Sequence, residues 1–556
     1  NNTADAFAGN DTTTISVYGG LAGNYTLDGT LPTGGTNFAT WGALDTALFL
    51  GGHCGAVDVF VNPVDTIQEQ ITIRSYANAS AQNYLYLHGQ GAIMSVLPNA
   101  ANRHLLRLDG AKYTLVDSLT LIGEDVTYGY GVHFIGDNQF DTLRHLTVDL
   151  SAITSTSSIN SAGLLFSGST SSTSTTGVVA SNCAVEHSSF LGGPGGGPYY
   201  GMRMNGLTFG AGNANNRIAH NKFYDAYNYQ VYLNNCDSLI FVGNEIARPS
   251  RSSISTFYGL YATGDLERSL IDGNVITNPN GGSPGYTGTT YGFYLLADAQ
   301  PGLENTFSNN LIYGLNSNGT LYGTYASSAI GNRFLNNTIS LDDQTATTGS
   351  TTYGAYFTGT GTPSSFVNNI VTVTREGSGT KYGLYINSTA AVDSTDNNVV
   401  YVNPVSGTPY YGFYSGIQPT LFDYQTNTPG WEANGVSADP LYFNALTGNL
   451  RPTALAVDNI GADVLTFVPN DYFGAARTST PDPGAIEFIV PNNDAGVFAL
   501  LNPGKNYCPG TGTVEANIRN FGLLNLTDVL IDWEINGAPQ PQVALSGMSL
   551  AQGQDT

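Results

Sequence analysis

Residues 291–325 read YGFYLLADAQPGLENTFSNNLIYGLNSNGTLYGTY, and this stretch begins and ends on the tetrad Tyr-Gly-x-Tyr. The tetrad occurs six times, with successive copies 33, 31, 31, 29 and 29 residues apart. The six copies are Tyr258–Tyr261, Tyr291–Tyr294, Tyr322–Tyr325, Tyr353–Tyr356, Tyr382–Tyr385 and Tyr411–Tyr414. Degenerate copies continue the series at Tyr130 (YGVH), Ala162 (AGLL), Tyr200 (YGMR) and Tyr229 (YQVY). Near-constant spacing over ten copies indicates a repeat architecture.

A second motif, Asn-x-apolar, follows each copy from Tyr200 onward. Its asparagines are Asn221, Asn244, Asn274, Asn310, Asn337, Asn369 and Asn398. No amphipathic helix fits inside a repeat, which excludes the common helical repeat families. Three short strands per turn predict an all-β fold, a parallel β-helix. Asparagine tolerates the left-handed conformation of sharp corners, and stacked copies can hydrogen-bond along the axis.

The N-terminal region extends this pattern. We expect the three strands of one coil at Leu105–Leu108, Tyr113–Val116 and Leu119–Leu121. Residues 37–50 carry a helical apolar stripe, formed by Phe38, Trp41, Leu44 and Leu48. Asn37 is a candidate N-cap and Gly51 a stop signal. Because the open end of a solenoid needs a cover, this segment is predicted to be the N-terminal capping helix.

The amino-acid composition excludes several classes of protein. The chain has 556 residues, with 18 basic and 42 acidic ones, so its net charge is −24. This balance argues against binding to nucleic acid, and no apolar run is long enough to span a membrane. The four cysteines, Cys54, Cys183, Cys236 and Cys508, lack metal-ligand spacing and do not make a disulfide framework. Because the chain starts at Asn1 without an apolar leader, we interpret it as a processed or truncated product.

The last position of the tetrad is predicted to face outward, because earlier copies place His133 and Arg203 there. We therefore expect an external ladder of seven tyrosines, with a glycine beside each ring that leaves its face uncovered. These candidate binding residues are Tyr232, Tyr261, Tyr294, Tyr325, Tyr356, Tyr385 and Tyr414. Two interpretations are open: the rings only stack on one another, or the ladder binds a glycan or a protein partner.

Signals for catalysis are weak, and we predict no catalytic residue, no metal site and no cofactor. The charged candidates do not recur at matching phase on adjacent coils; they are Asp265, Glu267 and Arg268; Arg217, His220, Lys222 and Asp225; Arg375, Glu376 and Lys381. The acidic pair Asp342 and Asp343 is expected in a solvated turn. His145, His187 and His220 have spacings that allow stacking, and turn packing is favoured over metal binding. Calcium at acidic turns has no EF-hand loop to support it.

Both ends of the repeat region resemble a known superfamily. Residues 25–95, which include DTIQEQITI at 65–73, look like the start of right-handed parallel β-helix proteins of the pectate-lyase-like superfamily. Residues 437–487, with SADP at 437–440 and PGAIE at 483–487, resemble the close of many secreted β-helix proteins. A polysaccharide-cleaving β-helix would need either paired carboxylates or a calcium site with a nearby basic residue. The active-site motifs of pectate lyases and pectin esterases are not visible, and fold alone does not carry function.

From Asn493 the pattern changes to strands joined by turns such as Asn536-Gly537. This part resembles the CARDB-like immunoglobulin-type modules of secreted Bacteroidota proteins. It is short for such a sandwich, so we expect that the natural protein continues. Triplets such as Asp11-Thr12-Thr13 and Asp393-Ser394-Thr395 resemble the O-glycosylation acceptor pattern of exported Bacteroidota proteins.

Together these patterns predict lead-in strands at 1–36, a right-handed parallel β-helix at 37–490, and the start of an Ig-like β-sandwich at 491–556. The favoured hypothesis is a non-catalytic, adhesin-like or structural protein, secreted or on the outer face of a Gram-negative outer membrane. Its partners would be a polysaccharide or another cell-surface component, and resemblance implies export by the type IX secretion machinery. The alternative is a secreted polysaccharide lyase or glycoside hydrolase that acts in a groove of the β-helix.

Overall fold

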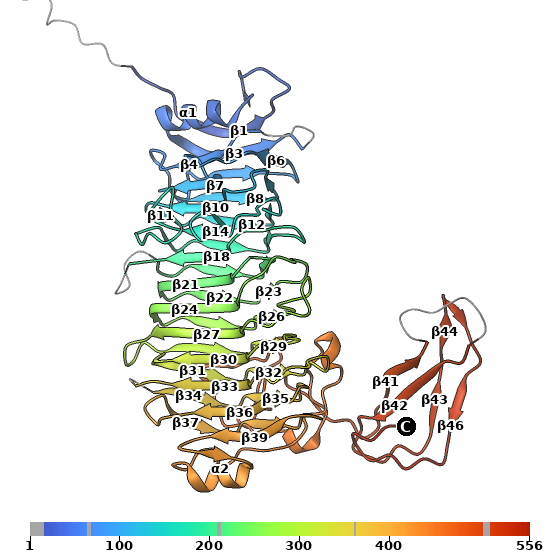
Figure 1. Ribbon diagram of the computed structural model, residues 1–556. Helices are drawn as coiled ribbons and strands as arrows, with labels where there is room; N and C mark the ends of the chain where they lie inside the picture. Colours follow the sequence, from blue (N-terminus) through green and yellow to red (C-terminus); the bar gives the residue numbers. More distant parts are fainter. Residues whose placement is uncertain (1–15, 64–67, 208–212, 361–362, 504–511) are drawn as a thin grey trace, which may run out of the picture.

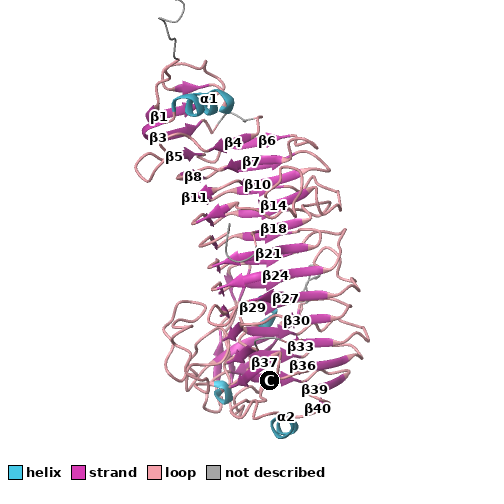
Figure 2. Cartoon of the chain, turned by 90° about the vertical axis from the view of Figure 1, so that its left-hand side faces the viewer, coloured by secondary structure: helices cyan, strands magenta, loops and turns pink. Residues whose placement is uncertain are grey.

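The computed structural model describes residues 16–63, 68–207, 213–360, 363–503 and 512–556. Three long sheets, here named A, B and C, stack coil upon coil into a solenoid, as Figures 1 and 2 show. Within a coil the chain runs from sheet C to sheet A to sheet B, and neighbouring strands of these sheets are parallel, as in β10–β14, except for the antiparallel pair β39–β40. The predicted lead-in strands and Asp11-Thr12-Thr13 fall partly or wholly in 1–15, and part of DTIQEQITI falls in 64–67, outside the described residues.

Sheet C carries the tetrads. Its strands are β4 (Ile71–Arg74), β7 (His104–Asp109), β10 (Gly129–Ile135), β14 (Ser161–Phe166), β18 (Tyr200–Asn205), β21 (Tyr229–Asp237), β24 (Phe257–Glu267), β27 (Thr290–Asp298), β30 (Leu321–Ser327), β33 (Thr352–Thr358), β36 (Thr380–Ile386), β39 (Thr408–Phe413) and β40 (Ile417–Gln418).

Sheet A follows sheet C in each coil. Its strands are β2 (Asn37–Phe38), β1 (Leu21–Leu27), β3 (His53–Val61), β5 (Leu85–His88), β8 (Thr114–Asp117), β12 (Thr142–Arg144), β16 (Ala184–Glu186), β19 (Arg217–Ala219), β22 (Ile240–Val242), β25 (Leu270–Asp272), β28 (Asn305–Ser308), β31 (Asn332–Leu335), β34 (Ser364–Val367) and β37 (Val392–Asp396).

Sheet B closes each coil. Its strands are β6 (Ile93–Val96), β9 (Thr120–Gly123), β13 (Thr147–Asp149), β17 (Ser189–Leu191), β20 (Lys222–Tyr224), β23 (Glu245–Ala247), β26 (Val275–Thr277), β29 (Leu311–Tyr313), β32 (Thr338–Leu341), β35 (Ile370–Val373) and β38 (Val399–Val402). A short parallel pair, β11 (Asn138–Gln139) with β15 (Ala180–Ser181), adds to one corner. The strands expected at 105–121 are confirmed as β7, β8 and β9.

A helix lies near the N-terminal end of the solenoid, as expected. Helix α1 spans Trp41–Gly51 and buries Trp41, Leu44 and Leu48 in the continuous apolar core of the coils. The predicted N-cap was wrong, because the Thr40 side chain accepts the N–H of Ala43 whereas Asn37 belongs to β2. That this helix caps the solenoid stays a prediction.

The tetrad has an unusual side-chain arrangement. In β27 both Tyr291 and Tyr294 are half-buried at the surface, while Gly292 and Phe293 between them face the core. The prediction that glycine lies beside the exposed ring was wrong. A Cβ on Gly292 would lie 2.8 Å from Ile312 Cγ2 on β29 and 2.4 Å from the carbonyl oxygen of Gly323 in the next coil. Glycine is needed here because sheets B and C approach so closely.

Buried asparagines form a continuous ladder at the corner between sheets A and B. Each Asn Oδ1 accepts the backbone N–H and the Nδ2 of the asparagine one coil before it, as Asn310 does for Asn274 at 3.0 and 2.9 Å. Each Nδ2 also donates to a carbonyl of the previous coil, as Asn310 does to Ile271 at 2.9 Å. The predicted axial hydrogen bonds are confirmed. The left-handed φ belongs instead to the preceding residue, for example Asn309 at 51°.

Glu432 ends this ladder. Its carboxylate accepts the Nδ2 of Asn398 at 2.7 Å, the N–H of Asn398 at 3.3 Å and the hydroxyl of Thr395. The side chain has no solvent exposure, and burial raises its pKa to about 7. The buried hydroxyls of Tyr411 and Tyr424 have no hydrogen-bond partner in the described chain, and the charge of Glu432 acts on both.

The chain then folds back over sheet B. After α2 (Leu421–Asn427), residues 436–490, which include the 3₁₀ turns η2 (Ala445–Thr447) and η3 (Leu455–Val457), run along sheet B as a strap. The strap is anchored by bonds such as Ala485 N–H to Thr338 Oγ1 at 2.9 Å and Asn368 Nδ2 to the carbonyl of Ala462 at 2.8 Å. Three antiparallel pairs follow: β41 (Ala495–Asn502) with β42 (Glu515–Asn520), β43 (Val529–Ile531) with β46 (Val543–Leu545), and β44 (Glu534–Ile535) with β45 (Ala538–Pro539).

The glycine constraint predicts a specific instability. In Gly323→Ala the new Cβ would lie 2.4 Å from Ile339 Cγ2 and 2.5 Å from the carbonyl oxygen of Gly354. We expect a loss of about 1–3 kcal/mol in the free energy of unfolding, as for overpacked cores, measured by urea denaturation. Gly416→Ala is the matched control, because nothing lies within 4 Å of the position that its Cβ would take. Equal stability of the two variants would contradict the argument.

The buried carboxyl group of Glu432, which ends the asparagine ladder, predicts that the stability of the protein depends on pH. The pKa of about 7 lies above the ordinary 4.5, so the folded protein keeps a proton that the unfolded chain loses between those pH values. The contribution of this group to stability therefore falls as pH rises from 4.5 through 7. We expect urea titrations to show Glu432→Gln gaining stability relative to the wild type over that window. A stability difference that does not change with pH would refute this.

Candidate functional sites

Two columns of tyrosine rings run down the outer face of sheet C. The first column holds the first tyrosine of each tetrad: Tyr229, Tyr258, Tyr291, Tyr322, Tyr353 and Tyr382. The second holds the last: Tyr232, Tyr261, Tyr294, Tyr325, Tyr356 and Tyr385. Sequence reasoning found the second column and missed the first. The clue was in the tetrad itself, because two residues three apart share a face of a strand only when both residues between them turn inward.

We call the two columns together the tyrosine face. Its rings pack in a herringbone. Neighbours in the first column stack with centroids 4.6–5.5 Å apart and planes within 10° of parallel. Neighbours in the second column stack at 4.7–5.1 Å. Rings of different columns meet edge to face, as Tyr291 and Tyr294 do at 4.8 Å and 86°. Both arrangements are favourable for aromatic quadrupoles.

The herringbone packing determines which parts of the tyrosine rings are exposed to solvent. Each ring face is covered by neighbouring rings, so the surface presents ring edges and two rows of phenol hydroxyls rather than open aromatic faces. Burial raises the pKa of Tyr261 to about 12 and the pKa of Tyr291 even further. The hydroxyls of Tyr261 and Tyr291 are therefore neutral at physiological pH, and a tyrosine hydroxyl can both donate and accept hydrogen bonds.

The structure corrects one end of the predicted ladder. Tyr414 lies off the column, packs edge-on against Trp431, and leaves Phe413 to stack on Tyr385 at 4.4 Å. The strand β39 is shifted by one residue relative to the tetrad pattern, so Tyr410 pairs with Tyr382. At the other end the guanidinium of Arg203 lies 4.4 Å from the ring centroid of Tyr232.

The tyrosine face begins at β21, the strand that follows β18 in sheet C. His133 and Arg203, expected outside, are buried together with Leu165. Loops cover the upper coils, with the Tyr130 hydroxyl donating to the carbonyl of Ile159 at 2.6 Å and Asn205 Nδ2 donating to the carbonyl of Thr173 at 2.8 Å. An aromatic or cationic position in a repeat can therefore be buried by an insertion from another coil.

Most of the charged candidates have structural roles. Arg375 is fully buried and donates to Thr352 Oγ1 at 2.8 Å and to the carbonyls of Ser317 and Gly319. Lys381 is buried and bonds backbone carbonyls, while Glu376 accepts the hydroxyl of Ser406 at 2.7 Å. Burial lowers the pKa of Arg375 to about 10, yet the group stays charged at neutral pH.

The remaining candidates are paired or buried. Arg217 bonds Glu186, Lys222 lies 3.7 Å from Glu245, and Arg268 bonds Asp237. Asp225 is buried and accepts the N–H groups of Ser250 and Arg251 at 2.8 and 3.0 Å. Glu267 is buried, and Asp265 lies at the end of β24. The structure does not bring these groups together into one site.

The three corner histidines stack as predicted. Their ring centroids lie 5.7 Å apart for His145–His187 and 5.0 Å for His187–His220. All three have left-handed φ angles, near 50°. Among the described residues no group of three or more His, Cys, Asp and Glu side chains has the arrangement of a metal site.

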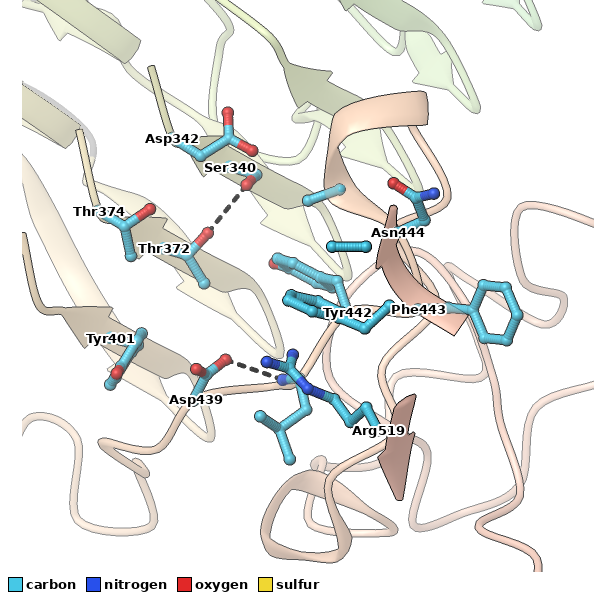
Figure 3. A pocket seen from close by; sticks show the side chains of 14 residues that line it. Ser340, Asp342, Thr372, Thr374, Tyr401, Asp439, Tyr442, Phe443, Asn444 and Arg519 are labelled. Carbon is cyan, nitrogen blue, oxygen red and sulfur yellow. Dashed lines mark hydrogen bonds between the residues drawn. The ribbon is translucent and has the colours of Figure 1, made fainter. Parts of the chain in front are cut away.

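A cavity of about 310 Å³ lies where sheet B, the strap and β41–β42 meet (Figure 3). We call it the seam cavity. Asp342, Thr372 and Tyr401 line it from sheet B and the residue that follows it, Asp439 and Tyr442 from the strap, and Arg519 from β42. Asp342 and Asp343 were expected in a solvated turn, but Asp343 is buried and accepts the N–H of Ser317 at 3.1 Å.

The seam cavity holds two carboxylates in different environments. Burial and the neighbouring Asp343 raise the pKa of Asp342 to about 6. Asp439 accepts the N–H of Leu441 at 2.9 Å. The Tyr442 hydroxyl feels both charges, and burial raises its pKa far above the ordinary range. A hydrogen bond with the Thr372 side chain acts in the opposite direction on this pKa. Arg519 Nε is buried without a hydrogen-bond partner in the described part of the chain.

Comparisons with known proteins agree with this architecture. Residues 205–405 match the family described as "Right handed beta helix region". No curated protein sequence matches the chain significantly. The fold is therefore that of a right-handed parallel β-helix. No helix of the described residues is long and apolar enough to cross a membrane.

Three of the similar solved structures have low sequence identity to this chain. The pectate lyase Pel9A is 11% identical, with a TM-score of 0.38 over 85% of this chain and 97% of its own. XylC in complex with xylose is 8% identical, with a TM-score of 0.43 over 84% and 98%. PfbA, a surface adhesin of Streptococcus pneumoniae, is 11% identical, with a TM-score of 0.33 over 68% and 91%. At this distance no substrate follows from the likeness.

Proposed function

We propose that the chain is an adhesin-like or structural protein, secreted or displayed on a cell surface, that uses the β-helix as a stiff binding platform. The tyrosine face is the observation that carries this proposal. It continues over six consecutive strands of sheet C, from β21 to β36, and its side chains are uncharged tyrosines. Type IX export and an Ig-like module from 491 onward belong to the same proposal.

The chemistry of the tyrosine face defines the partner. A sugar ring cannot stack on its aromatic faces, since these are covered. The hydroxyl rows repeat once per coil, roughly every 4.8 Å, and this step suits an extended partner with regularly spaced hydrogen-bonding groups. A polysaccharide chain has such groups along its whole length, and many weak contacts on a rigid surface add up without an ordering cost on the protein side.

A second candidate function is carbohydrate hydrolysis in the seam cavity. The specific observation is that Asp342 and Asp439 line one cavity and differ in environment. Glycoside hydrolysis needs one carboxylic acid to protonate the leaving oxygen and one carboxylate to act as base or nucleophile. Asp342, whose pKa is about 6, has the character of the acid. The more solvated Asp439 has the character of the base or nucleophile.

The platform proposal is tested by removing hydroxyls while keeping the rings. The double variant Tyr294→Phe plus Tyr325→Phe should retain its melting temperature within a few degrees, because the stacking is unchanged. It should lose at least tenfold in affinity for the glycans that the wild type binds on an array. Tyr18→Phe, at an exposed tyrosine far from this face, is the control. Unchanged affinity, or no glycan bound by the wild type, would refute glycan recognition by the tyrosine face.

The hydrolysis proposal is tested separately. Asp342→Asn and Asp439→Asn should each lower the release of reducing ends from a polysaccharide panel by at least about 100-fold, the lower range for acid–base groups. The alkaline limb of the wild-type pH profile should fall near pH 6, where Asp342 loses its proton. Asp463→Asn, at an exposed site, is the control. No reducing ends from the wild type would exclude this activity.

A further inference from the structure

A second aromatic surface lies on sheet A near the N-terminal end. A cavity of about 290 Å³ is bordered by Tyr84, Tyr113, Phe140, Thr142 and Arg144. Tyr113 and Phe140 come from adjacent coils and stack with centroids 5.0 Å apart. Phe140 is 47% exposed, which is high for a phenylalanine. We call this the aromatic cavity.

The backbone under these two rings is strained. Tyr113 and Phe140 have φ angles of 55° and 59°, in the left-handed region that bulky residues avoid. The register between β8, β12, β16, β19 and β22 places them at the same corner position as Asn182, Asn215 and Ser238 of the next three coils. Those coils use residues that adopt this conformation at lower cost or form local hydrogen bonds there. Two aromatic residues at this corner make the fold less stable than asparagine would, and they present apolar rings to solvent.

The polar edge of the aromatic cavity is held in place. Arg144 Nε donates to Asp117 Oδ2 at 2.8 Å, and its Nη2 donates to the hydroxyl of Tyr86 at 3.1 Å. Asp117 also accepts from His145 at 2.9 Å and from the hydroxyl of Ser118 at 2.8 Å. Burial opposes ionisation, but these hydrogen bonds lower the pKa of Asp117. Asp117 is therefore ionised and neutralises Arg144, which keeps donor capacity at the cavity rim.

We propose that the aromatic cavity is a binding subsite for a single neutral sugar ring. Such a ring has an apolar C–H face that can pack against the exposed part of the Phe140 ring, and hydroxyls at its rim that can bond Arg144 and Thr142. An acidic ring fits less well, since Asp117 cancels the charge of Arg144 and the whole chain carries −24. The subsite is independent of the tyrosine face, which lies on another sheet and has no open ring face.

Phe140→Asn separates binding from folding. Asparagine suits the left-handed corner, so the melting temperature should stay equal or rise, while affinity for the sugar should fall at least tenfold. The probes are cellopentaose, xylopentaose and mannopentaose as neutral ligands and pentagalacturonate as an acidic one, each titrated by calorimetry. Tyr113→Asn and Arg144→Ala should also weaken binding.

The controls make each result decisive. Asn182→Ser changes the same corner one coil away and should leave affinity unchanged. The double variant Tyr294→Phe plus Tyr325→Phe should also retain binding here, which distinguishes this subsite from the tyrosine face. Wild-type binding to none of the neutral probes, preference for pentagalacturonate, or unchanged affinity in Phe140→Asn would each overturn the proposal.

Discussion

The structure depends on how a narrow coil satisfies the backbone groups at its buried corner. A strand that turns sharply inside the solenoid leaves N–H and C=O groups that water cannot reach, and such groups are costly when unpaired. Here one amide side chain per coil pairs with both neighbours, from Asn221 to Asn398, and Glu432 closes the series. Because each asparagine needs the next at the same azimuth, the ladder keeps the coils between Asn221 and Asn398 in register.

The same narrowness shapes the surface. In β24 to β36, sheets B and C are so close that the glycine after the first tyrosine has no room for a Cβ, and the following side chain fills the core. Only β21 among the strands of the tyrosine face has a larger residue there, Gln230. Two inward residues in succession then turn Tyr291 and Tyr294 to one face, although alternation along a strand would place them on opposite sides. The tyrosine face is thus a consequence of core geometry as well as a binding candidate. Its rings stabilise the stack of coils by roughly 0.5–1.5 kcal/mol per favourable pair.

Much of this fold could be read from spacing, because a repeat reports the same local physics many times. The period of the tetrads and the asparagine motif predicted the sheets, the register and the axial hydrogen bonds. Departures from the repeat could not be predicted from the sequence. The shift that removes Tyr414 depends on the antiparallel β40, and the burial of His133 depends on loops from other coils. The seam cavity joins residues nearly 180 positions apart in sequence, Asp342 and Arg519, which no local pattern connects.

This contrast indicates where function is to be sought in a solenoid. Positions that obey the repeat are explained by the repeat, since the core, the corners or the stack requires them. Positions that break it at a cost need another cause, and strained or partner-less groups concentrate at functional sites. Phe140 and Tyr113 replace the corner residues that favour a left-handed backbone. In the seam cavity, Arg519 Nε is buried without a partner in the described chain, and Asp342 is a carboxylate of raised pKa. Neither arrangement helps the coil to close. By this criterion the aromatic cavity and the seam cavity are stronger indications of ligand chemistry than any single ring of the tyrosine face, whose contribution must come from its length.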